Sequence, residues 1–257
     1  MNPEQDPVQP VCTYHDALSI WFFRGVKILT QHIRQPLVSA PTDKIVDEAI
    51  FASGHKSYYR DTGKRIFDVA LVMVAALPVL VILVILGVVI ALDGKSPFYV
   101  QSRVGRNGRI FRMVKLRSMV FDADARLRAF LDYNPQARAI WDRDQKLQDD
   151  PRVTVIGRFI RKTSLDELPQ LWNVLIGDMS LVGPRPMMVN QQELYPGTAY
   201  YALRPGITGF WQISVRNGSS FAARAGFDSA YLRKLSLKTD VAVLFRTVGA
   251  VLRGSGC

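Results

Sequence analysis

The sequence predicts an α+β fold that is mostly helical, with one long apolar helix and a small β-hairpin. Three observations predict it. An uncharged apolar run extends from Val69 to Leu92, and Asn107-Gly108 separates two stretches in which apolar and polar residues alternate. The stretches 122–147 and 221–253 have helical periodicity. Since apolar residues make up 48% of the 257 positions, the chain can also bury a sizeable core.

Residues 1–61 form an N-terminal appendage whose role the sequence leaves open. Within it, Ala17–Ile33 has the spacing of a short amphipathic helix, and Pro36 ends that pattern. This helix could pack on a core or contact a membrane through Trp21, and the sequence favours neither interpretation.

The apolar run is long enough to enter a bilayer, because a stretch of about 20 apolar residues can cross one. A fully buried core helix is the alternative. Lys64 and Arg65 precede the run and Lys95 follows it, and positive residues tend to stay on the cytoplasmic side. Pro78 lies inside the run, where it removes a backbone hydrogen bond and kinks a helix. We therefore expect residues 62–95 to form a re-entrant membrane helix that bends at Pro78 and returns.

The next segment, Phe98 to Arg117, reads as a β-hairpin. Asn107-Gly108 is a strong turn signal between alternating stretches. The charges of this segment are nearly all positive and include Lys115. A solvated basic ribbon would explain them, but the neighbouring membrane segment favours binding of anionic headgroups or substrate phosphates.

A charged helical stretch of mixed sign then extends from Asp122 to Leu147, with a break near Asn134-Pro135. Solvated surface is its default reading. A short apolar segment, Val153 to Phe159, follows and leads into the most informative motif of the chain.

That motif is the acidic pair Asp166-Glu167, which follows the fixed positive charges of Arg161 and Lys162. One reading is structural, because Ser164-x-x-Glu167 has the form of a helix capping box. The other is chemical: one carboxylate attacks a phosphorus atom while the other helps to hold a divalent cation such as Mg²⁺. The capping box does not account for the two basic residues, but both readings stay open at this point.

Two arginines beside prolines follow the acidic pair. Arg185 lies between Pro184 and Pro186, and Arg204 precedes Pro205. Proline restricts its neighbours to rigid extended or turn conformations. A fixed guanidinium suits bidentate phosphate binding, so both arginines are candidate substrate contacts.

The C-terminal stretch 221–253 carries an apolar stripe and reads as helical and amphipathic. Core packing and a position in the membrane interface are its two readings. The net charge of +11 makes anions the expected partners: nucleic acid, anionic lipid or phosphorylated small molecules. The sequence contains no P-loop and no GxGxxG fingerprint, which argues against a P-loop kinase and a dinucleotide enzyme.

Over residues 62–257 the chain resembles the bacterial sugar transferases, the monotopic phosphoglycosyl transferases that begin exopolysaccharide or glycan assembly. Five motifs carry the resemblance in the family's order: Lys64 to Asp68, Lys115 to Met119, Thr163 to Gln170, Gly183 to Pro186, and Arg204 to Gly209. The insertion at 134–152 and the ending at 253–255 look most like the undecaprenyl-phosphate galactose-1-phosphate transferases of exopolysaccharide synthesis.

The resemblance implies a reaction. A sugar 1-phosphate, with galactose or glucose as the sugar, moves from a UDP-sugar to polyprenyl (undecaprenyl) phosphate through an aspartyl-phosphosugar intermediate, and UMP is released. The family's nucleophile matches Asp166, its Mg²⁺-binding residue matches Glu167, and its phosphate contacts match Lys115, Arg161 and Arg185.

The resemblance also implies a location. Residues 96–257 would form a cytosolic catalytic domain, held by the re-entrant helix and by amphipathic interfacial helices to lipid at the cytoplasmic face of the bacterial inner membrane. In relatives the kink is often at Ser-Pro, whereas here it is at Leu77-Pro78.

Two other classes of function stay open. One is a Mg²⁺-dependent hydrolase of nucleotide sugars or lipid diphosphates, with water as the acceptor. The other is a non-enzymatic, basic, membrane-bound binding protein. Because the basic residues cluster with acids and prolines instead of forming a plain basic patch, we expect no nucleic-acid partner. A homo-oligomer is neither required nor excluded.

Overall fold

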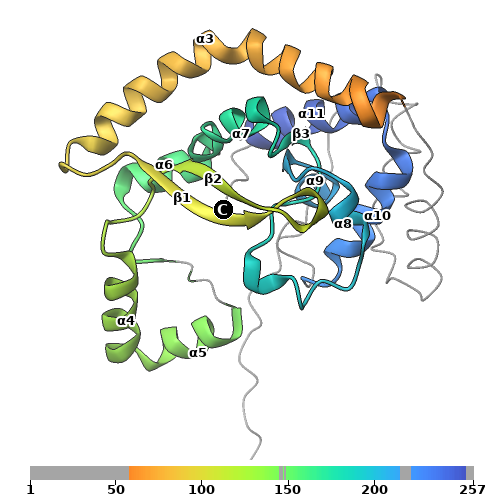
Figure 1. Cartoon of the computed structure of the whole chain (residues 1–257). Coiled ribbons are helices and arrows are strands. Elements are labelled where there is room, and N and C mark those ends of the chain that lie inside the picture. The colour runs from red at the N-terminus through yellow and green to blue at the C-terminus, as the bar shows by residue number, and fades with distance from the viewer. Residues whose placement is uncertain (1–57, 145–146, 148, 215–220, 253–257) are drawn as a thin grey trace, which may run out of the picture. The chain divides into compact units, whose positions relative to one another are not determined.

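The computed structural model describes residues 58–144, 147, 149–214 and 221–252, and the expected helix at Ala17–Ile33 lies outside them. The described chain is mostly helical, and it contains two small two-stranded sheets (Figure 1). The helices are α3 (Lys64–Ala91), α4 (Ala123–Tyr133), α5 (Pro135–Asp144), α6 (Val155–Lys162), α7 (Gln170–Ile176), α8 (Ala199–Ala202), α9 (Phe210–Ser214), α10 (Arg224–Lys234) and α11 (Leu237–Leu252). The strands are β1 (Phe98–Val104), β2 (Ile110–Leu116), β3 (Ser180–Val182) and β4 (Gly206–Thr208).

The long apolar helix is α3, which begins five residues before the predicted run and contains Pro78 in its interior. Figure 1 shows one continuous helix that changes direction near its middle. Its apolar side chains point outward: Val74 is 80% exposed and Leu77 is 73% exposed. The alternative of a buried core helix is therefore wrong. In the described part of the chain, α3 is the one helix whose length and apolar composition would suit a membrane.

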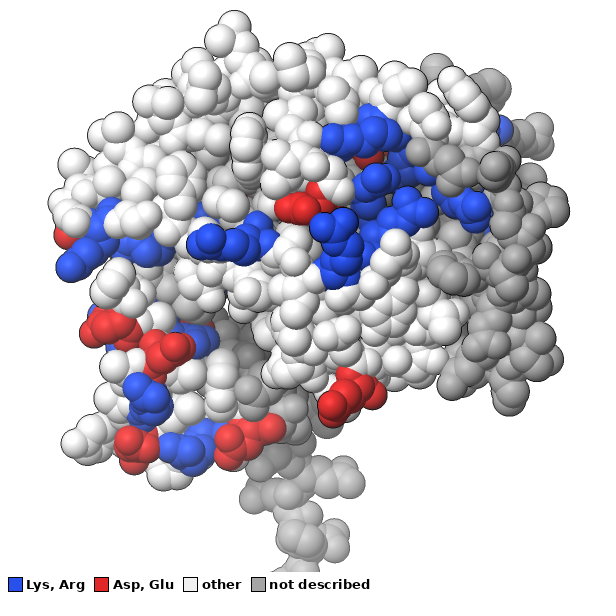
Figure 2. All heavy atoms as spheres, in the orientation of Figure 1, with Lys and Arg blue, Asp and Glu red and all other residues white. Residues whose placement is uncertain are grey.

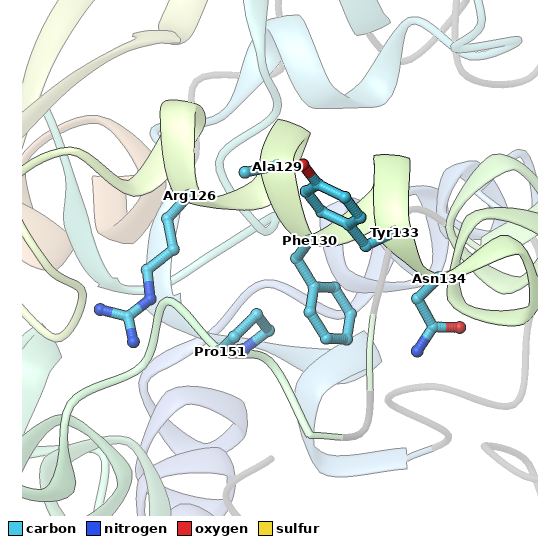
Figure 3. Close-up of a pocket in the computed structure, with 6 residues that line it drawn as sticks. All are labelled: Arg126, Ala129, Phe130, Tyr133, Asn134 and Pro151. Carbon is cyan, nitrogen blue, oxygen red and sulfur yellow. The ribbon is translucent and has the colours of Figure 1, made fainter.

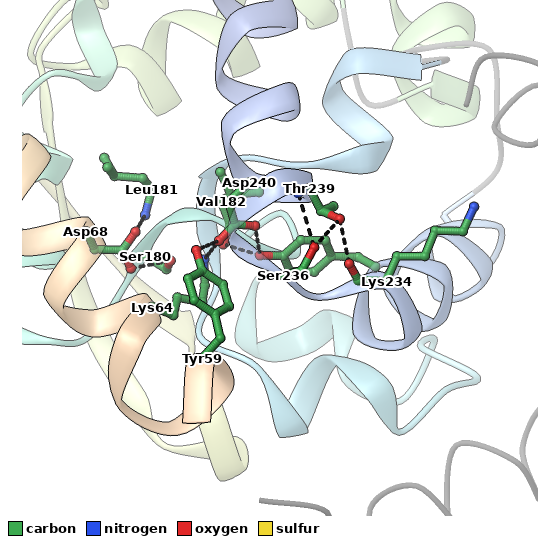
Figure 4. Close-up of polar contacts among 11 residues, drawn as sticks. Tyr59, Lys64, Asp68, Ser180, Leu181, Val182, Lys234, Ser236, Thr239 and Asp240 are labelled. Atoms are coloured by element: carbon green, nitrogen blue, oxygen red, sulfur yellow. Dashed lines mark hydrogen bonds and ion pairs between the residues drawn. The ribbon is translucent and has the colours of Figure 1, made fainter. Parts of the chain in front are cut away.

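The start of α3 is held by a set of polar contacts that we call the N-terminal clamp (Figure 4). Asp240 of α11 is fully buried and accepts hydrogen bonds from Lys64 Nζ at 2.7 Å, Tyr59 Oη at 2.7 Å and Tyr231 Oη at 2.6 Å. One turn further along α3, Asp68 accepts from Ser180 Oγ at 2.6 Å. Since buried charges need partners, these residues fix α3 against α11 and β3.

The end of α3 is held by a second set of contacts, the C-terminal clamp. The buried guanidinium of Arg117, just after β2, forms a bidentate pair with Asp93, with both N–O distances 2.7 Å. It also donates to the carbonyl oxygens of Ser96 at 2.8 Å and Ile90 at 3.1 Å. Both ends of the apolar helix are thus fastened to the same body of folded chain.

The predicted β-hairpin is confirmed. β1 and β2 pair antiparallel from Phe98↔Leu116 to Val104↔Ile110. Asn107 has a φ of 59° and Gly108 a φ of 75°, which is the left-handed backbone that an Asn-Gly turn provides. Asn173 of α7 bonds to β2 through the backbone N of Val114 at 3.1 Å and the carbonyl oxygen of Arg112 at 2.8 Å, so α7 and the hairpin are fixed together.

The other helical predictions hold with one correction. The charged stretch forms α4 and α5, which meet at Asn134 as expected. The C-terminal stretch is not one amphipathic helix. It forms α10 and α11, separated at Leu235 and Ser236, and α10 is buried over most of its length. The parallel pair β3–β4, in register Ser180↔Gly206 and Val182↔Thr208, was not predicted.

The N-terminal clamp leads to a stability prediction. Asp240→Ala leaves the buried Lys64 ammonium without its carboxylate, and breaking a buried pair in this way costs about 3–5 kcal/mol. We expect a large fall in the thermal unfolding temperature of the purified protein. Asp132→Ala removes the exposed pair with Arg138 and should cost below about 1 kcal/mol. Equal shifts in the two variants would contradict a stabilising role for the clamp.

Candidate active site

The acidic pair lies on a short 3₁₀ turn, Leu165–Glu167, between α6 and α7. Ser164 enters this turn with a φ of 57°, a left-handed conformation that costs a non-glycine residue of order 1–2 kcal/mol. The Ser164 side chain makes no capping hydrogen bond, so the capping-box reading is wrong. The acidic residues are therefore not explained by helix capping, and the strained turn is what presents them.

Glu167 pairs with Lys115 from the end of β2. Lys115 Nζ donates to Glu167 Oε1 at 2.8 Å, and the two side chains are 21% and 25% exposed. The predicted metal ligand and one predicted phosphate contact are thus in direct contact, although 52 residues separate them in the sequence.

Asp166 is largely withdrawn from water. Burial raises its pKa, the neighbouring Glu167 carboxylate raises it further, and the charges of Lys115 and Arg161 act in the opposite direction. A poorly solvated carboxylate between two cations has the surroundings expected of a nucleophile that must approach a phosphate.

Arg161, in the last turn of α6, is held in place by a hydrogen bond from Nε to Ser118 Oγ at 2.8 Å. Its pKa is lowered by burial, and the Asp166 carboxylate counteracts that effect. Lys115, Arg161, Asp166 and Glu167, all predicted from the sequence, are therefore neighbours in the structure.

The two arginine–proline motifs are brought together by close backbone contacts. Gly183 N donates to Thr208 O at 2.8 Å, and Gly206 N donates to Pro184 O at 2.8 Å. A Cβ at Gly183 would lie 2.3 Å from the carbonyl oxygen of Arg204, so only glycine fits there. This contact fixes the backbone that carries Arg185, whose exposed guanidinium lies over the Trp211 ring at 5.5 Å.

Arg204 has different surroundings from Arg185. Its Nε donates to the carbonyl oxygen of Gly177, the residue that ends α7, at 2.9 Å. Arg204 does not line the pocket described next, although Gly206 does. Its assignment as a substrate contact stays a prediction, and its visible role is to hold the end of α7.

A small pocket of about 30 Å³ lies beside the acidic pair. Figure 2 shows Lys and Arg side chains gathered around acidic atoms on one face of the molecule. The lining includes the predicted Lys115, Glu167 and Arg185, and it also contains residues that the sequence did not single out for this role: Arg103, Met113, Gln170, Pro186, Gly206, Ile207 and Gln212.

A larger hollow of about 490 Å³ lies next to α4 (Figure 3). Phe130, Tyr133 and Pro151 line it, and Arg126 is the one charged residue among the described residues of its wall. Since these described residues include no carboxylate and no second cation, they lack the groups that phosphate chemistry needs, and the smaller pocket is the candidate active site.

Arg224 adds a further cation near this pocket. Its guanidinium lies 4.3 Å from the Trp211 ring centre and 4.9 Å from that of Phe221. Burial and the charges of Arg185 and Arg103 lower its pKa to about 10. Arg103 was visible in the sequence only as one of several hairpin charges, and no local signal identified Arg224.

Known proteins give an independent comparison. The family model described as bacterial sugar transferase matches residues 59–254. The UDP-galactose-lipid carrier transferase of Erwinia amylovora is 50% identical over 198 residues, which cover 75% of this chain and 41% of that protein. The undecaprenyl-phosphate galactose phosphotransferase of Salmonella typhimurium is 46% identical over 198 residues, which again cover 75% of this chain and 41% of that protein.

A shorter relative is covered almost completely. The exopolysaccharide production protein ExoY of Sinorhizobium fredii is 45% identical over 196 residues, which cover 75% of this chain and 87% of that protein. The chain thus spans about two fifths of the length of the first two relatives and most of the third. Because the family model covers well over half of the chain and includes the acidic pair and its basic neighbours, the chain belongs to the bacterial sugar transferase family.

Proposed function

We propose that this protein transfers a sugar 1-phosphate from a UDP-sugar to polyprenyl (undecaprenyl) phosphate at the start of exopolysaccharide synthesis. The single observation that carries the proposal is the convergence of Lys115, from the end of β2, with Arg161, Asp166 and Glu167, from the junction of α6 and α7, at one site. The relatives named for lipid-carrier and undecaprenyl-phosphate galactose transfer support the two substrates, and they favour galactose as the sugar.

The first step is attack by a carboxylate oxygen of Asp166 on the phosphorus that carries the sugar. The P–O bond to the uridylyl group breaks and UMP leaves. In the second step an oxygen of polyprenyl phosphate attacks the same phosphorus, the bond to Asp166 breaks, and the carboxylate is regenerated. Two steps on one nucleophile let two large substrates use one small site in turn.

The basic residues make the first step feasible. A diphosphate repels an attacking carboxylate, so its charge must be offset before the two can approach. Arg161 and Lys115 already lie in the electrostatic surroundings of Asp166. Arg185 is exposed on a rigid backbone and lines the same pocket, where it can bind phosphoryl oxygens with two N–H groups.

We expect Mg²⁺ to assist, with Glu167 as its protein ligand. In the described residues no group of three or more His, Cys, Asp or Glu side chains is placed to hold a metal on its own. The adjacent carboxylates fit a Mg²⁺ that takes one or two protein oxygens and completes its coordination with phosphate oxygens and water. When bound, the ion would offset charge on the diphosphate and the leaving UMP.

The helix α3 supports a proposed location. Its outward-facing apolar residues need lipid, and both of its ends are fastened to the same folded body by the two clamps. We therefore propose that residues 62–95 are re-entrant, that residues 96–257 form the catalytic domain on the cytoplasmic face of the inner membrane, and that 1–61 is an appendage. Exposed apolar side chains on three further helices would lie in the interface: Val155 and Phe159 of α6, Trp172 of α7, and Phe245 of α11.

The central test is a mass-resolved assay of the purified protein. With UDP-galactose alone, intact-protein mass spectrometry should find a phosphogalactose adduct, and adding polyprenyl phosphate should discharge it. Asp166→Asn should lower transfer about a thousandfold or more, since the nucleophile is lost. UMP release that does not depend on the lipid would favour the hydrolase alternative, and a preference for an N-acetylated donor would overturn the choice of sugar.

Thermal stability supplies the control for Asp166→Asn. Burial raises the pKa of Asp166, so the fold loses stability as the pH rises from the ordinary carboxyl range through that raised pKa. The variant should therefore be at least as stable as the wild type at pH 7, and this difference should vanish below the ordinary pKa. If the variant is inactive because it is unfolded, the adduct measurement on the wild type decides whether Asp166 is the nucleophile.

Metal dependence gives a separate prediction. EDTA should abolish transfer and Mg²⁺ should restore it, while Glu167→Gln should require far more Mg²⁺ for half-maximal rate. Glu193→Gln, at an exposed residue, is the matched control and should behave like the wild type. Full activity in chelator, with metal removal verified by elemental analysis, would count decisively against this scheme.

The topology can be tested with single cysteines in a variant in which Cys12 and Cys257 are serine. Tyr58 and Lys95 are exposed on either side of α3, whereas Gly94 has a φ of 76° that disfavours cysteine. Cysteines at these two exposed positions should resist an impermeant reagent in intact cells and react after permeabilisation. Labelling of either one in intact cells would mean that α3 crosses the membrane, and Pro78→Leu should increase such labelling.

A further inference from the structure

Two buried hydrogen-bond donors line the candidate active site without an acceptor. Gln170 is only 2% exposed, and its Nε2 has no hydrogen-bond partner in the described structure. Arg103 donates through its terminal nitrogens to Pro186 O at 3.2 Å and Gln101 Oε1 at 2.6 Å. Its buried Nε, however, has no hydrogen-bond partner among the described residues. Both residues line the pocket that contains Glu167.

Donors of this kind are uncommon in native proteins. The large majority of buried polar side-chain atoms have at least one hydrogen-bond partner, and each exception calls for an explanation. A polar group that faces a pocket is explained when a ligand supplies the missing acceptor. Here the two residues that carry such groups line the same small pocket, which points to a ligand with more than one acceptor atom.

The charges around the pocket indicate which ligand chemistry fits. Lys115 and Arg185 lie in the same lining, and Glu167 is the only carboxylate among the described residues that form it. The pKa of Arg103 is lowered by burial and then by the charge of Arg185, so the cations are close enough to repel each other. A phosphoryl group, with several acceptor oxygens and negative charge, satisfies the donors and the cations together.

Gln170 is also fixed relative to the proposed nucleophile. It is the first residue of α7 and comes three residues after Glu167, with only Leu168 and Pro169 between them. Backbone bonds from Leu168 N to Leu165 O at 3.2 Å and from Leu171 N to Leu168 O at 3.1 Å join the two turns. Because the amide and the acidic pair share one rigid segment, a phosphoryl oxygen held by Gln170 is also positioned for Asp166.

We propose that Gln170 and Arg103 are substrate-binding residues that complete a phosphoryl-oxygen subsite beside the acidic pair. This inference rests on the proposed function and deepens it, since it assigns the subsite to a phosphoryl group of the reaction. That group belongs either to the diphosphate of the UDP-sugar or to the phosphate of the polyprenyl acceptor, and the two half-reactions distinguish them.

The test uses Gln170→Leu, which removes the donors but keeps an uncharged side chain of similar size. Calorimetry with UDP and with pyrophosphate measures binding to the purified full chain. The rates of adduct formation from UDP-galactose and of adduct discharge to polyprenyl phosphate are measured separately. We expect at least one of these four quantities to weaken about tenfold or more, the usual effect of losing a hydrogen bond to a charged group.

Two variants make the result specific. Gln136→Leu makes the same change at an exposed position of α5 and should alter none of the four quantities. Gln170→Glu nearly preserves shape but places a negative charge at the pocket, so it should weaken phosphate binding more than Leu does. The unfolding temperature of Gln170→Leu should not fall, because the buried amide nitrogen has no bond to lose. If Gln170→Leu does not fold, the same four quantities are measured on Gln170→Glu, and their weakening decides the test.

The outcomes separate the sources of the phosphate. Weaker UDP binding with slower adduct formation assigns the subsite to the donor, whereas normal adduct formation with slow discharge assigns it to the acceptor. If Gln170→Leu retains wild-type values for both binding constants and for both adduct rates, the inference is wrong even though the protein is active. If the wild type forms no adduct, the proposed function fails, and binding of UDP and pyrophosphate alone decides whether the subsite exists.

Discussion

The fastening of α3 at both ends is the constraint on which the rest of the structure depends. An exposed apolar helix attached at one end could take many directions. Here Asp240 holds Lys64 at the start, and Arg117 holds Asp93 just past the end. The buried pair is costly to desolvate, and removing one partner is costlier still, so the geometry is strongly specified. The bend near Pro78 lets a single helix satisfy both attachments.

The N-terminal clamp also reaches the candidate active site. Arg65 donates to the carbonyl oxygens of Val174 and Leu175, which lie in the last turn of α7, and Asp68 binds Ser180 at the start of β3. The first turn of α7 carries Gln170, directly after the acidic pair, and β3 leads into the segment that carries Arg185. Residues at the base of the apolar helix therefore support two walls of the pocket, so the placement of the helix on the folded chain and the position of the site are set by the same contacts.

The sequence predicted the features that depend on neighbouring residues. The hairpin follows from Asn107-Gly108, and the acidic pair stands out because both carboxylates are adjacent. Arg224 was missed as a near-pocket residue because its role arises only when distant segments converge. Gln170 follows the acidic pair closely in the sequence, but the burial of its side chain and its unpaired amide nitrogen are visible only in the structure. The β3–β4 pair was missed because strands of three residues carry no periodicity. The capping-box reading failed because Ser164 adopts a left-handed backbone, which its sequence pattern does not reveal.

The contact between Gly183 and Gly206 has a genetic consequence. A Cβ at Gly206 would lie 2.1 Å from the backbone nitrogen of Gly183, and at Gly183 the obstacle is again main chain. When a new side chain meets another side chain, a second mutation can make room for it. Backbone atoms cannot be trimmed in this way. Alleles that replace either glycine should therefore resist intragenic suppression, whereas an added side chain that meets only another side chain leaves a route to revertants.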